Sequence, residues 1–173
     1  MSKRELSKYL HTLSKKELET QVQELYDRLK EVREFYNFVF NPKEDKMVDE
    51  AKFKISKEYF PASNRKPKRR RSVAQKYIRT FIKLGVDPHL IADVMLYNIE
   101  IAQVANADKA ISQDSFYKSM LNSFEEALHY FQEQNLSTKF RPRIDKILEN
   151  TETQKWINAD AFELQFDKLI LNK

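Results

Sequence analysis

The fold is decided by residues 87–107, D-P-H-L-I-A-D-V-M-L-Y-N-I-E-I-A-Q-V-A-N-A, the most apolar stretch of a highly charged chain. Asp87 is a good helix N-cap, and Pro88 suits the first helical turn, where a backbone N–H has no partner within the helix. The apolar residues that follow cover more than half of a helix circumference, so this helix needs neighbours on several sides. Asp93 and Glu100 interrupt them, which argues against a membrane span. We therefore predict a helix here, among the most buried elements of the protein.

The composition indicates an all-α protein. The 173 residues are enough for one domain with a core and too few to expect two. A single glycine disfavours β-hairpins and phosphate-binding loops, and the lack of cysteine excludes disulfides and thiolate chemistry. We predict one domain over residues 1–173, built as a compact or slightly superhelical array of seven or eight helices. The charged N-terminus has no apolar run typical of a secretion signal, so we expect a cytoplasmic protein.

The clearest periodicity lies between residues 15 and 40. Its apolar residues alternate steps of four and three, as in a coiled coil: Leu18, Val22, Leu25, Leu29, Val32, Tyr36 and Val39. One interpretation is a homodimer that forms through helix 15–40. The other is a helix that packs within its own chain, bent near Lys30. Phe35 and Phe38 widen the apolar face beyond a narrow seam and favour the second interpretation.

Positive charge is concentrated in residues 62–86, which carry nine Lys and Arg and no Asp or Glu. These cations are Arg65, Lys66, Lys68, Arg69, Arg70, Arg71, Lys76, Arg79 and Lys83. Most of them belong to a basic loop, 62–71, which leads into a helix predicted over 73–84 with Ser72 as its cap. Cations at a helix N-terminus oppose the helix dipole, and a bound anion would relieve this.

We therefore predict that these nine residues bind an anionic partner, either a protein or a nucleic acid contacted through its phosphates. The most direct function is a non-enzymatic binding or scaffold protein. Two other interpretations stay open. In the first, the basic loop 62–71 is a solvated segment that binds nothing. In the second, the loop pairs within the chain with residues 87–136, which carry two basic and eight acidic residues.

Other sites have weaker support in the sequence. His89, Asp93 and Glu100 share one face of the central helix and form the alternative site of an enzyme. Glu126 and His129 have the spacing of a di-iron ligand pair, but the second pair that such bundles need is missing. We therefore expect no catalytic residue, no metal, no cofactor and no membrane partner.

Three segments resemble a known family: S-K-R-E-L-S-K-Y-L at 2–10, R-R-S-V-A-Q-K at 70–76, and G-V-D-P-H-L-I-A-D-V-M-L-Y at 85–97. Together they are similar to a bacterial family of all-helical proteins catalogued as a domain of unknown function. The similarity covers nearly the whole chain, and the third segment is its most specific part. It implies a soluble helical protein and gives no activity, ligand or catalytic residue.

Overall fold

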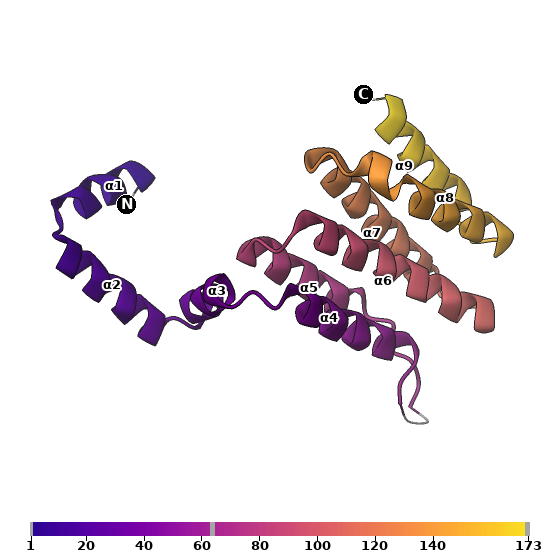
Figure 1. The fold of residues 1–173 in the computed structure, drawn as a ribbon. Coiled ribbons are helices and arrows are strands. Elements are labelled where there is room, and N and C mark those ends of the chain that lie inside the picture. Colours follow the sequence, from indigo (N-terminus) through magenta and orange to yellow (C-terminus); the bar gives the residue numbers. More distant parts are fainter. Residues whose placement is uncertain (1, 63–64, 172–173) are drawn as a thin grey trace. The chain divides into compact units, whose positions relative to one another are not determined.

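A computed structural model describes residues 2–62 and 65–171, and these ranges contain helices and no strands. The all-α fold class is therefore confirmed (Figure 1). The described residues form nine helices where we predicted seven or eight. They are α1 (Lys3–Thr12), α2 (Lys15–Arg28), α3 (Lys30–Phe40), α4 (Glu44–Tyr59), α5 (Arg71–Leu84), α6 (Pro88–Asp108), α7 (Asp114–Glu133), α8 (Ser137–Thr153) and α9 (Ala159–Leu171).

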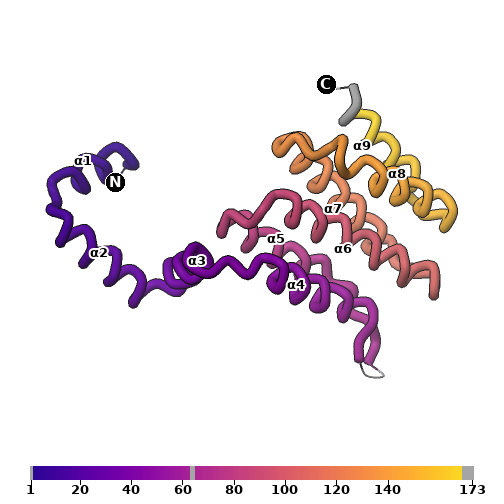
Figure 2. Tube along the Cα trace, in the orientation of Figure 1, coloured from indigo at the N-terminus to yellow at the C-terminus, as the bar shows by residue number. Residues whose placement is uncertain are grey.

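The additional helix arises because the predicted continuous helix 15–40 is broken at Leu29. This residue has an extended backbone, with φ −114° and ψ 116°, and the chain changes direction between α2 and α3 (Figure 2). Arg33 stabilises the corner, since its Nη2 donates to the carbonyl of Asp27 at 2.8 Å and its Nε to that of Tyr26 at 3.4 Å. Both carbonyls lie at the end of α2, where no helical N–H reaches them.

The chain divides into two compact units, residues 1–43 and residues 44–173. The first unit contains α1–α3, and none of these helices has a buried residue. The second unit contains α4–α9. The single domain over residues 1–173 stays a prediction.

Helix α6 forms the centre of the second unit. It packs against α4, α5, α7 and α8, while α9 packs against α7 and α8. Ten of its residues are buried, more than in any other helix described, so the prediction for 87–107 is confirmed. Not every apolar residue of the stretch is buried, since Val104 is 56% exposed. Within the described ranges, no helix has the length and apolar character needed to cross a membrane.

Capping residues explain several of the helix boundaries. Ser2 and Ser14 each form a complete capping box with the glutamate three residues later. The Asp87 carboxylate accepts a hydrogen bond of 2.7 Å from the backbone N–H of His89, as expected of an N-cap. The cap predicted at Ser72 is wrong, because α5 begins at Arg71 and Ser72 lies inside it.

Three helices, α5, α7 and α8, end in the same Schellman turn. One residue after the end of α5, and two residues after the ends of α7 and α8, a residue has a left-handed backbone with φ between 53° and 77°: Gly85, Asn135 and Lys155. The next residue donates its N–H back to the carbonyl five positions earlier, at 2.8–3.1 Å, and is buried: Val86, Leu136 and Trp156. Each turn therefore ends a helix and anchors the following segment in the core.

Candidate anion-binding surface on α5

The basic loop is attached to the end of α4 by Glu58. Both carboxylate oxygens of this buried residue bind Arg70, with Oε1 2.7 Å from Nη2 and Oε2 2.9 Å from Nε. The backbone N–H groups of Arg69 and Arg70 also donate to Glu58, to its carbonyl and its carboxylate respectively. The hydrogen bond from the Arg70 side chain holds the pKa of Glu58 below its ordinary value. Arg70 therefore joins α5 to α4 and is engaged within the chain.

Arg71 joins α5 to α7 in a similar way. Its Nε donates to the Ser123 hydroxyl at 2.9 Å, and its Nη2 forms an ion pair with Glu126. The other Glu126 oxygen accepts a hydrogen bond from Gln75. Pairing with residues 87–136, the alternative left open by the sequence, is therefore found for Arg71.

Of the other four cations of the basic loop, one is hydrogen-bonded within the chain and three are exposed. Arg69 has a left-handed backbone, with φ 54°, and its Nη1 donates to the Gln113 side chain at 3.3 Å. Arg65, Lys66 and Lys68 are exposed on the segment that precedes α5.

The remaining three predicted cations, Lys76, Arg79 and Lys83, lie on the outer face of α5 and are exposed. With Arg71, Ser72, Gln75 and Thr80 they line an open groove of about 420 Å³ along this helix. No acidic residue lines the groove, and none of the three cations forms an ion pair with another described residue. This surface, which we call the α5 groove, is the accessible part of the predicted site that lies on a helix, whereas the exposed Arg65, Lys66 and Lys68 lie on the segment before α5.

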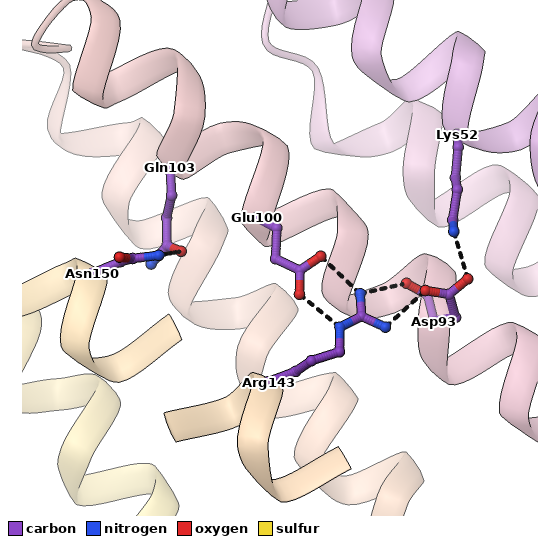
Figure 3. Close-up of polar contacts among 6 residues, drawn as sticks. All are labelled: Lys52, Asp93, Glu100, Gln103, Arg143 and Asn150. Atoms are coloured by element: carbon purple, nitrogen blue, oxygen red, sulfur yellow. Dashed lines mark hydrogen bonds and ion pairs between the residues drawn. The ribbon is translucent and has the colours of Figure 1, made fainter. Parts of the chain in front are cut away.

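Asp93 and Glu100, two residues of the alternative enzyme site, bind Arg143 of α8 (Figure 3). The Arg143 guanidinium binds both Glu100 oxygens at 2.7 Å and one Asp93 oxygen at 2.7 Å, and Lys52 of α4 binds the other Asp93 oxygen. Burial raises the pKa of Asp93, but the hydrogen bonds and charges of Lys52 and Arg143 outweigh it and hold this pKa below its ordinary value. A carboxylate held ionised in this way is poorly suited to donate a proton near neutral pH. The cluster connects α4, α6 and α8.

His89, the third residue of the alternative site, does not join this cluster. Its ring lies 6.3 Å from that of Phe140, measured between centroids, and its Nδ1 has no hydrogen-bond partner among the described residues. Glu126, the candidate metal ligand, is occupied by Arg71 and Gln75. Among the described residues, no three acidic or histidine side chains gather where they could hold a metal ion.

A second row of polar contacts lies along α6, beside the charged cluster. The buried Gln103 side chain donates to the carbonyl of Ile147 at 2.8 Å and accepts from Asn150 at 3.2 Å, with both partners on α8 (Figure 3). Asn98 donates to the hydroxyl of Ser123 on α7. These partners satisfy polar groups that would be costly to bury alone, so the row fixes how α6 packs.

Sequence reasoning did not identify Glu58 or Arg143, which hold these contacts together. Glu58 lies in a region of nearly balanced charge, and Arg143 is 43 residues from Glu100 along the chain. Neither position carries a local signal, because only the tertiary packing of α4, α6 and α8 brings the partners together.

The model of a family of unknown function, DUF6155, matches residues 1–169. The chain belongs to this family. The match spans both units and the α5 groove. No curated protein and no solved structure matches the chain. Because DUF6155 carries no assigned activity, the function has to be argued from the geometry of the chain itself.

Proposed function

We propose that this protein is a non-enzymatic binding protein whose α5 groove binds an anionic partner. The observation that carries the proposal is the set of exposed cations Lys76, Arg79 and Lys83 on one face of α5, in a groove whose lining contains no acidic side chain among the described residues. Each of the other predicted cations that has a partner inside the chain, such as Arg70, is needed to join helices. The three cations on the outer face of α5 do not join it to another described helix.

The spacing of these cations fits a partner with several negative charges in a row. At about 1.5 Å per residue, Lys76, Arg79 and Lys83 span roughly 10 Å of the helix axis. Ser72 adds a hydroxyl group to the same groove, and both hydroxyls and cations commonly donate hydrogen bonds to phosphate oxygens, whereas the Thr80 hydroxyl already donates to the carbonyl of Lys76. A nucleic acid bound here would be contacted through its backbone, so its affinity would be salt-dependent and largely independent of sequence.

The test is the binding of fluorescently labelled RNA, DNA and a poly-glutamate peptide, followed by anisotropy over a series of salt concentrations. The informative variant is Lys76→Gln/Arg79→Gln/Lys83→Gln. We expect it to lose most of the affinity and to reduce the slope of log K against log salt by about 2–3, because each phosphate contact contributes roughly 0.7–0.9 to that slope. An unchanged affinity would contradict the proposal.

The matched control is Lys46→Gln/Lys118→Gln/Lys139→Gln, which removes the same charge from exposed positions on α4, α7 and α8. Equal losses in both triple variants would show that net charge matters and that the α5 groove does not. Substitution of Arg70 or Arg71 is unsuitable for this purpose, since these side chains hold α5 to α4 and α7. Their loss would weaken binding by disturbing the fold.

A further inference from the structure

Helices α1–α3 leave their apolar faces without cover from their own unit. Nine large apolar residues in them or beside them are 37–81% exposed: Leu6, Tyr9, Leu10, Val22, Leu25, Leu29, Phe35, Val39 and Phe40. Apolar patches of this extent are uncommon on monomeric soluble proteins and mark interaction surfaces. A three-helix unit with no buried residue also lacks the core that would stabilise it alone.

The corner at Leu29 turns part of this surface into a groove. Val22 and Leu25 of α2 face Val32, Phe35 and Tyr36 of α3 across a space of about 350 Å³, with Glu31 as the only charged residue in its lining. The contacts that hold the corner fix the walls of the groove. Arg33 bonds to the end of α2, and the Tyr26 hydroxyl donates to the Asn37 side chain of α3 at 3.0 Å.

We propose that a second copy of this chain covers this surface, so that residues 3–40 of two copies form a symmetric dimer. The apolar residues recur at steps of four and three along α2 and α3, the spacing by which helices pack on other helices. A two-fold dimer needs a single self-complementary patch, and here ridges of apolar side chains lie next to an apolar groove on the same patch. The proposal is independent of the function of the α5 groove.

Charge and area are also compatible with a second copy. Residues 1–43 carry nine basic and seven acidic side chains, so two copies would not repel each other strongly. A fully exposed aromatic residue offers roughly 150–250 Å², and Leu or Val somewhat less. About half of that area on each of the nine residues is on the order of 700 Å² per copy, close to the roughly 800 Å² per partner of a stable interface.

The first test is the mass of the full chain in solution, by sedimentation or light scattering over a wide concentration range. We expect twice the 20.7 kDa of one chain, and we expect Leu25→Glu to give a monomer. Gln23→Glu is the control, since it adds the same charge to an exposed polar position of α2. A monomeric wild-type chain would overturn the proposal, and so would a Leu25→Glu variant that stays dimeric.

A second test does not depend on a destabilising substitution. The chain has no cysteine, so a single introduced thiol can form a disulfide only between copies. A two-fold axis pairs each thiol only with its own symmetry mate, so at least one of Val22→Cys, Leu25→Cys and Phe35→Cys, treated with a mild oxidant, should give a covalent dimer that a reductant reverses, while Gln23→Cys should stay largely monomeric. Equal cross-linking at all four positions, or stronger cross-linking at Gln23→Cys than at each of the apolar positions, would overturn the proposed interface.

Discussion

Arg143 is the one cation that touches both acidic residues of α6 in the charged cluster. Its side chain is 33% exposed, and the carboxylates of Asp93 and Glu100 are 26% and 33% exposed. Partly buried pairs of this kind contribute little net stability when complete. Removing one partner is costly, because the other charges remain desolvated.

Replacement of Arg143 by Met should therefore lower the free energy of unfolding by about 1–3 kcal/mol, less than for a fully buried pair because water reaches the cluster. Lys146→Met is the control, since it removes a cation of the same helix from a pair whose side chains are 64% and 63% exposed. Its effect should stay below about 0.5 kcal/mol. Urea unfolding at neutral pH measures both, and equal effects would contradict the structural importance of the cluster.

At the residue scale, the sequence predicted which residues carry charge and did not predict their partners. All nine cations of the basic region were identified, yet Arg70 and Arg71 turned out to be engaged with Glu58 and Glu126. Charge density is a local property of the sequence, whereas pairing depends on which helices meet. The spacing of Lys76, Arg79 and Lys83 alone places them on the outer face of the helix, whereas the partners of Arg70 and Arg71 are seen only in the folded chain.

At the scale of the helices, the Schellman turns explain where α5, α7 and α8 end. The three turns differ in the residue that takes the left-handed conformation. Gly85 has it at no steric cost, Asn135 at a small cost, and Lys155 at the largest cost. Replacing a left-handed residue that has a Cβ by glycine should therefore stabilise the protein, whereas replacing a left-handed glycine by a residue with a Cβ should destabilise it.

Lys155→Gly should stabilise the protein by about 0.5–1 kcal/mol, and Gly85→Ala should destabilise it by about 1 kcal/mol. A Cβ added at Gly85 would meet no atom within 4 Å, so the cost would come from the backbone alone. Lys155→Ala serves as the control, because it removes most of the side chain and keeps the Cβ that makes the left-handed backbone costly. Urea midpoints with unchanged m-values are the measurement. A loss of stability in Lys155→Gly would contradict a left-handed backbone there.

Several helix boundaries were predictable because the residues that cap them are recognisable in the local sequence. Ser2, Ser14 and Asp87 start helices, and Gly85 ends one, as expected from their side chains and backbone preferences. The corner at Leu29 lies one residue from the bend that we predicted near Lys30, but no Gly or Pro marks it, so the sequence did not predict that the helix would end there. It depends on Arg33 and on tertiary contacts, which a helical period does not reveal.

At the scale of the whole molecule, the two units differ sharply in what they bury. The buried side chains among the described residues all belong to residues 44–173, including the single tryptophan, Trp156, which is 3% exposed. The first unit contributes helices without a core.

A fragment of residues 44–173 should therefore fold alone. We expect it to keep the blue-shifted emission of Trp156 and the denaturation midpoint of the full chain, and to lose the far-ultraviolet circular dichroism that α1–α3 contribute. Under the proposed dimer interface, the fragment should also be monomeric. A fragment that unfolds at much lower denaturant would instead support the single domain over residues 1–173 that the sequence predicts.

The central place of α6 also bears on how fast the second unit forms. Its partners α5 and α7 are its immediate neighbours along the chain, and α4 and α8 are the next ones. During folding, the chain therefore has to close only short loops before the apolar face of α6 is covered, so the entropic barrier to folding stays low. Helical proteins with such local contacts refold in microseconds to milliseconds. Rapid folding would expose the apolar surface of α6 to water only briefly after synthesis.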